Sequence, residues 1–291
     1  MKSRLARRPA AVALAAVLAV TVSACSTAAS VSPAPTSAAA ASGLSMASAP
    51  PTAGLSGSLT IFGAASLKAV LAKAQAAFNG ANPGLTITVS TDSSAALETQ
   101  IEQGAPADVF LSADTTNPAK LVAKGLNAGG AVNVAGNLLT VIVPKANPAA
   151  IVSPSDLARP GVKVIAAGVS VPITKYATIL VANLAAQAGY PADFVAKYNA
   201  NVVSREDNVA AVVSKIELGE GDAGIVYVTD ARTSTGVTTI SVPADANVPA
   251  TYAGVVVAAS RNLPAASAFL AWFAGPTGQA ILASYGFLPP S

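Results

Sequence analysis

The chain has 291 residues, of which 52% are hydrophobic and 11% charged, with seventeen Lys and Arg, fourteen Asp and Glu, and no histidine. The absence of histidine excludes a Ser-His-Asp catalytic site. The formal net charge of +3 gives no argument for binding nucleic acid or an acidic membrane surface.

The first 57 residues predict export rather than a folded core. Residues 1–24 combine four basic residues with an apolar run from Ala10 to Val20, which is typical of a secretory signal. Cys25, the only cysteine, follows a sequence that resembles a bacterial lipoprotein cleavage box, so we expect it to carry lipid. Residues 25–57 are uncharged and rich in Ala, Ser and Pro, which predicts a lipid-anchored linker. Without residues 1–24, thirteen Lys and Arg face fourteen Asp and Glu, so the exported chain has no basic character.

From Ser58 the hydrophobic pattern becomes regular. Strands are expected at 59–62, 85–89 and 109–111, with helices at about 67–78 and 94–103 between them and another helix ending at Lys124. Alternating strands and helices predict a parallel sheet with helices on both faces.

The second half of the chain repeats this alternation. Strands are expected at 138–143, 162–166, 224–227, 237–242 and 252–258, and helices at 172–188, 191–198, from 209, at 264–273 and at 276–285. We therefore predict two α/β lobes, with residues 58–139 and 243–291 in lobe I and residues 140–242 in lobe II. The chain would cross between the lobes near Leu138 and Val237, and a ligand would bind in the cleft.

Several strands end directly before a helix begins, and small or hydroxyl residues stand at these corners. Ser66 and Ser94 occupy two such corners in the first lobe, and Ile173 and Val209 lie at helix starts in the second. Tyr227 ends a strand, so its hydroxyl can reach the cleft. Helix starts present unpaired N–H groups and a positive dipole end, which together suit a small oxyanion.

The segments around these corners resemble those of a known protein family. The chain resembles the periplasmic molybdate-binding proteins of bacterial ABC importers over nearly everything from Ser58 onward. The resemblance is carried, in order, by Gly63-Ala64-Ala65-Ser66-Leu67, Ser93-Ser94-Ala95-Ala96-Leu97, Gln103 to Asp114, Val171-Pro172-Ile173, Glu206-Asp207-Asn208-Val209, Gly224-Ile225-Val226-Tyr227 and the Gly275-to-Phe287 segment.

The resemblance implies a two-lobed type II solute-binding fold with molybdate or tungstate as ligand. It implies that Ser66 and Ser94 donate hydroxyl and N–H groups, that Ile173 and Val209 donate backbone N–H groups, and that Tyr227 donates its hydroxyl. It also implies that the protein delivers its ligand to permease subunits and needs no cofactor. Together with the expected lipid on Cys25 and the lack of histidine, we expect a monomer without enzymatic activity, anchored by lipid at the outer face of the cytoplasmic membrane.

Two residues depart from the family's pattern. Ile173 is bulkier than the usual alanine or glycine and would narrow the cleft, while its N–H is retained. Asp92 lies two residues before Ser94, and a carboxylate that faced the ligand would repel an anion, so we expect it to point away.

Other functions remain open at this point. Sulfate or another tetrahedral oxyanion is the nearest alternative ligand. A ferric site would need several converging tyrosines and carboxylates, and only Tyr227 is placed for one. A lipid-anchored adhesion protein would show no ligand response. No nucleophile motif, phosphate-binding loop or metal-ligand spacing indicates an enzyme.

Overall fold

The computed structural model of this chain describes residues 54–290. The predicted signal segment at 1–24, Cys25 and most of the predicted linker at 25–57 lie outside these residues. Within the described part, none of the helices has the length and apolar character needed to cross a membrane.

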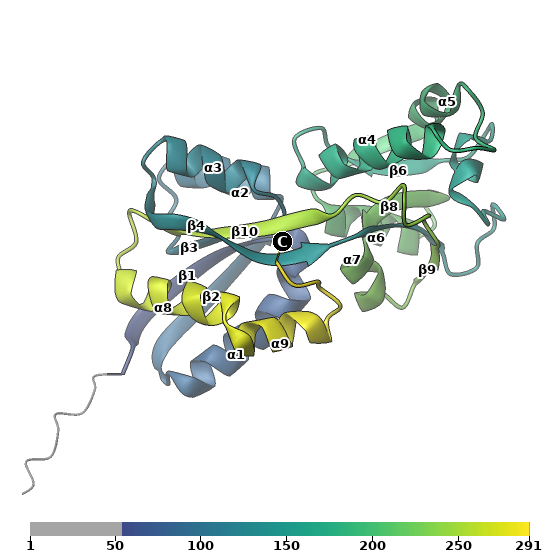
Figure 1. Cartoon of the computed structure of the whole chain (residues 1–291). Coiled ribbons are helices and arrows are strands. Elements are labelled where there is room, and N and C mark those ends of the chain that lie inside the picture. Colours follow the sequence, from purple (N-terminus) through teal and green to yellow (C-terminus); the bar gives the residue numbers. More distant parts are fainter. Residues whose placement is uncertain (1–53, 291) are drawn as a thin grey trace, which may run out of the picture. The chain divides into compact units, whose positions relative to one another are not determined.

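The first sheet is mixed and carries helices on both faces. Its five strands, in spatial order, are β2 (Gly84–Asp92), β1 (Ser56–Ala64), β3 (Val109–Ser112), β10 (Ala250–Val257) and β4 (Asn127–Asn137). β1 is parallel to β2 and β3, as predicted, whereas β10 is antiparallel to β3 and β4. One face is covered by α2 (Ser94–Glu102) and α3 (Thr116–Ala123), and the other by α1 (Lys68–Ala81), α8 (Leu263–Ala274) and α9 (Pro276–Ser284) (Figure 1).

The second sheet has the same kind of architecture. Its strands, in spatial order, are β7 (Val202–Glu206), β6 (Val164–Ala167), β8 (Ala223–Tyr227), β5 (Leu139–Pro144) and β9 (Val237–Ile240). One face is covered by α4 (Pro172–Ala185) and α5 (Phe194–Ala200), and the other by α6 (Val209–Glu217) and α7 (Val228–Thr233) (Figure 1). Two short 3₁₀ turns, η1 (Ala65–Leu67) and η2 (Pro154–Ala158), complete the elements.

The chain crosses between the two sheets twice. It leaves the first sheet between β4 and β5 and returns between β9 and β10, which agrees with crossovers near Leu138 and Val237. The predicted two-lobed fold is therefore confirmed. The lobe boundaries at 139/140 and 242/243 stay a prediction.

Two strands are missing from the sequence prediction, and several boundaries differ. β4 is built mainly from Ala, Gly and Asn, which are weak strand formers, and it owes its conformation to pairing with β10 along nearly its whole length. β7 is also missing from the prediction. β1 begins at Ser56 rather than Leu59, because Ser56 and Gly57 pair with the start of β2. α4 ends at Ala185 rather than Ala188, and α5 begins at Phe194 rather than Pro191.

Gly224 in β8 allows α6 to pack closely against the second sheet. A Cβ atom added at Gly224 would lie 2.9 Å from Val212 Cγ1 and 3.1 Å from the carbonyl oxygen of Ile165. The close packing of α6 on β8 therefore needs glycine at this position. The first helical residue of α6, Val209, is thereby held near the end of β8, where Tyr227 lies.

Candidate functional site

The two serine corners of the first lobe use their hydroxyl groups differently. Ser66 lies inside η1, and its Oγ is hydrogen-bonded to the hydroxyl of Tyr252 at 2.9 Å. Ser94 is the first residue of α2, and its Oγ accepts a hydrogen bond from Ala113 N at 3.0 Å. Because Ser94 accepts in this contact, its own hydroxyl hydrogen remains available to a ligand. Ser93 precedes Ser94 as N-cap, but its side chain makes no capping bond.

In the second lobe, the three predicted residues lie at the ends of elements. Ile173 is the second residue of α4, after Pro172, and Val209 is the first residue of α6. Neither N–H has an intrahelical partner at such positions. Asn208 caps α6 through its Oδ1, which accepts from Ala211 N at 3.1 Å. Tyr227 is the last residue of β8 and is 1% exposed.

All five predicted residues line one small cavity of about 10 Å³. The starts of four helical segments, at Ala65, Ser94, Pro172 and Val209, converge on it from both lobes. Each start adds the positive end of a helix dipole and unpaired N–H groups. No Lys, Arg, Asp or Glu is among the described residues that line the cavity, so its polar groups are hydroxyls, backbone groups and the Asn208 amide.

Two hydroxyl groups at this cavity have no hydrogen-bond partner among the described residues. Tyr227 OH and Ser93 Oγ are both buried and unpaired. A buried polar group without a partner costs about 1–3 kcal/mol, and such groups are rare in folded proteins. Burial also raises the pKa of Tyr227 well above 10, so its hydroxyl keeps its proton and can donate to a ligand. The arrangement suits a guest that accepts hydrogen bonds.

A buried polar network holds Ser66 in place. Asn137 Nδ2 donates to Tyr252 OH at 3.3 Å and to Thr229 Oγ1 at 2.8 Å. When the Tyr252 oxygen accepts from Asn137, its own proton is free to point to Ser66 Oγ at 2.9 Å. The hydrogen of Ser66 is then left to donate into the cavity. Tyr252 and Asn137 are not among the sequence-predicted residues.

A row of aromatic rings holds the Tyr227 side chain. The ring centroids of Tyr227 and Tyr252 are 5.5 Å apart, and those of Tyr176 and Tyr227 are 6.3 Å apart, both in edge-type contacts. Tyr252 in turn meets Phe287 at 5.5 Å. The phenol oxygen of Tyr227 is therefore positioned by packing rather than by a hydrogen bond.

The predicted orientation of Asp92 agrees with the structure. Its Oδ1 accepts from Ser93 N at 2.7 Å and from Asn208 Nδ2 at 3.0 Å, and Asp92 is not among the residues that line the cavity. The second of these bonds joins the corner before α2 to the N-cap of α6. The carboxylate thus links the two lobes beside the site without facing it.

A second carboxyl group, Asp230, lies behind Tyr227. It is 8% exposed, and its Oδ2 accepts a hydrogen bond from Tyr227 N at 3.2 Å. Burial raises the pKa of Asp230 from 3.8 to about 7, although the Tyr227 N–H opposes this shift. Because the folded pKa lies above the unfolded value, ionisation destabilises the fold progressively as the pH rises between these values. At about 1.4 kcal/mol per pKa unit, the full cost is on the order of 4 kcal/mol.

The comparisons with known proteins agree with this site. Residues 59–288 match the family described as bacterial extracellular solute-binding protein. The chain belongs to this solute-binding protein family. The molybdate-binding protein ModA of Mycobacterium tuberculosis is 34% identical over 234 residues, which cover 80% of this chain and 85% of that protein. The resemblance seen in the sequence is therefore confirmed.

Solved structures of solute-binding proteins show the same fold. The periplasmic molybdate-binding protein of Azotobacter vinelandii aligns over 80% of this chain and all of its own, with a TM-score of 0.68 and 24% identity. The sulfate-binding protein SubI of Mycobacterium tuberculosis aligns over 80% of this chain and 86% of its own, with a TM-score of 0.70 and 25% identity. The relatives are thus named for two different tetrahedral oxyanions.

Proposed function

We propose that this protein captures molybdate or tungstate outside the cytoplasm and delivers it to the permease of an ABC importer. The observation that supports this most directly is the buried, unpaired hydroxyl of Tyr227 at a cavity where helix starts from both lobes converge. The 34% identity to a molybdate-binding protein supports the choice of ligand. In this proposal Ser66, Ser94, Ile173, Val209 and Tyr227 donate hydrogen bonds to the oxyanion, and Ser93 adds a hydroxyl.

Fixed neutral donors suffice for a doubly charged anion. A charge-assisted hydrogen bond contributes about 1.5–3 kcal/mol, and donors held by strand ends and helix starts need no reorganisation when the anion arrives. The backbone N–H groups among these donors cannot accept the proton that hydrogen phosphate carries, which disfavours this anion. The carboxylates of Asp92 and Asp230 do not line the cavity.

Movement of the lobes would admit the anion. The residues that donate in this proposal are all buried, with exposed fractions of 1–9%. A hydrated anion can reach them only when the lobes separate, and a hinge at the two crossovers between the sheets would permit this. The bond between Asp92 and Asn208 would then form on closure.

Sulfate is the competing ligand, because the chain also resembles a sulfate-binding protein. Both anions are fully deprotonated dianions at neutral pH, so hydrogen-bond type does not separate them. Titration calorimetry with molybdate, tungstate, sulfate and phosphate distinguishes the two assignments. We expect tight binding of molybdate and tungstate, weaker binding of sulfate and no heat with phosphate. Tight sulfate binding without a molybdate response would contradict the proposal.

The double variant Ser66→Ala with Ser94→Ala tests the location of the site. It should weaken molybdate binding strongly, and the exposed Ser284→Ala on α9 should leave it unchanged. If these variants bind molybdate with equal affinity, the two corner serines stabilise the fold and do not contact the ligand.

The export and anchoring of the chain belong to the same proposal. The signal at 1–24, lipidation of Cys25 and the linker that follows would hold the lobes near the permease. A monomer without catalytic activity or a cofactor is expected for this role.

A further inference from the structure

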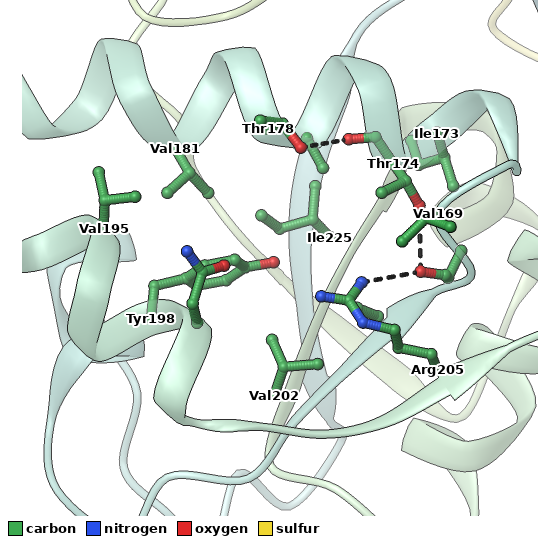
Figure 2. A pocket seen from close by; sticks show the side chains of 14 residues that line it. Val169, Ile173, Thr174, Thr178, Val181, Val195, Tyr198, Val202, Arg205 and Ile225 are labelled. Carbon is green, nitrogen blue, oxygen red and sulfur yellow. Dashed lines mark hydrogen bonds between the residues drawn. The ribbon is translucent and has the colours of Figure 1, made fainter.

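A second cavity, of about 160 Å³, lies within the second lobe between α4, α5, β6 and β7. Figure 2 shows its lining, in which Val181, Val195, Val202 and Ile225 form an apolar wall. The volume is close to that of an engineered cavity of about 150 Å³ that takes benzene. This cavity therefore has room for a guest with a compact apolar body.

Two polar groups face one another at this cavity. Tyr198 is 7% exposed, and its hydroxyl has no hydrogen-bond partner among the described residues. Figure 2 shows this hydroxyl pointing into the cavity toward the guanidinium group of Arg205. Burial raises the pKa of Tyr198 to about 12 although the charge of Arg205 opposes the shift, so the hydroxyl is a donor.

Most N–H donors of the Arg205 guanidinium group are not used in bonds to the protein. Its Nη1 donates to the carbonyl oxygen of Ala167 at 3.2 Å, and no carboxylate among the described residues pairs with it. Arg205 itself is exposed at the mouth of the cavity, together with Val169, Thr178 and Asn199. A guest can therefore reach the cavity from solvent without movement of the lobes.

We propose that this cavity binds a small organic monoanion, of the class of benzoate, with its carboxylate on Arg205 and Tyr198 and its apolar body against the valines. A planar guanidinium group matches a carboxylate with two parallel hydrogen bonds. One cation and one hydroxyl suit a single negative charge, whereas the mostly apolar wall disfavours an inorganic dianion.

This cavity is distinct from the candidate oxyanion site but shares a wall with it. Ile173, which is 1% exposed, lines both cavities. Its side chain lies between them, which accounts for a residue bulkier than alanine at this position. The other donors of the oxyanion site do not line the second cavity.

Titration of the ¹⁵N-labelled protein with sodium benzoate, followed by NMR, tests the proposal. We expect saturable shifts in the millimolar range, centred on the amides of Thr174, Thr178, Tyr198 and Arg205. Benzoate should cause the same shifts when the protein is saturated with molybdate. Shifts that do not saturate, or that molybdate abolishes, would overturn the proposal.

Variants and a neutral probe test the polar contacts. Arg205→Gln should weaken benzoate binding by about fivefold to tenfold, and Tyr198→Phe by about fivefold. The matched control Arg261→Gln, at an exposed arginine that does not line the cavity, should have no effect. Ala177→Leu retains both polar groups but fills the cavity, so it should abolish binding. Benzamide should bind at least about fivefold more weakly than benzoate, and equal binding of the two would refute the role of Arg205.

Discussion

Replacing Tyr227 with phenylalanine should make the ligand-free protein more stable and its molybdate complex weaker. The side chain is 1% exposed, and its hydroxyl has no partner among the described residues. Phenylalanine keeps the ring, which packs edge-on against Tyr176 and Tyr252, so the substitution removes one oxygen and little else.

The two effects have opposite signs for a single reason. An unpaired buried hydroxyl costs about 1–3 kcal/mol. Its removal should therefore raise the free energy of unfolding by an amount on the order of 1 kcal/mol. For a domain of this size, that raises the unfolding temperature by about 2–4 °C. The same hydroxyl would give the bound oxyanion a charge-assisted bond worth about 1.5–3 kcal/mol. Its loss corresponds to roughly 10-fold to 150-fold weaker binding.

Titration calorimetry with molybdate and scanning calorimetry of the ligand-free protein measure the two quantities. Tyr176→Phe is a matched control, because its ring lies beside Tyr227 but its hydroxyl is hydrogen-bonded to the backbone of Thr251. That variant should lose stability by about 1 kcal/mol and keep its molybdate affinity within about twofold. If Tyr227→Phe destabilises the ligand-free protein, or binds molybdate as well as the parent, the unpaired hydroxyl is not the donor that we infer.

Four further substitutions test other parts of the structure. Ser94→Ala should lower both the unfolding temperature and the molybdate affinity, because it removes the acceptor of a buried N–H worth about 1–3 kcal/mol; unchanged stability in calorimetry would contradict this. Tyr252→Phe should weaken molybdate binding by about fivefold in a titration, because it releases the hydroxyl of Ser66, and an unchanged affinity would exclude the network. Asp230→Asn should gain stability relative to the parent as the pH rises from about 4 to 7 in urea unfolding, whereas parallel curves would contradict the raised pKa. Cys25→Ser should move the protein from the membrane fraction to the soluble fraction of a bacterial host, and continued membrane association would refute the lipid anchor.

The convergence of the five predicted residues could be inferred from sequence because it follows from local rules. A strand that stops at small residues and continues as a helix places a helix start at the edge of a sheet. Ser66 and Ser94 follow β1 and β2, which are parallel neighbours, so their corners meet at one edge. The resemblance to a known family added the donor roles of Ile173 and Val209 in the second lobe, because the side chains of these two residues carry no signal.

The supporting residues could not be inferred, because their roles depend on pairing between distant segments. Asn137 ends β4, a strand that forms only through its long pairing with β10. Tyr252 lies on β10, and its contact with Ser66 spans 186 residues of sequence. Ser93 occupies the N-cap position of α2, yet its hydroxyl makes no capping bond. The cavity beside Arg205 depends on the space left between α4, α5 and β7, and hydrophobic periodicity does not specify how closely these elements pack.

Selectivity between dianions in such a site would rest on the spacing of the two lobes. Charge does not separate molybdate from sulfate, and the donors on Ser66 and Ser94 belong to a different lobe from those on Ile173 and Val209. Contacts that limit closure, such as the 3.0 Å bond that joins the two lobes through Asp92, would therefore set the distance between the two donor sets. An anion of matching size engages both sets, whereas a smaller one leaves bonds to one lobe stretched. Losing two charge-assisted bonds costs about 3–6 kcal/mol, a preference on the order of a hundredfold to ten-thousandfold, without any charged side chain at the cavity.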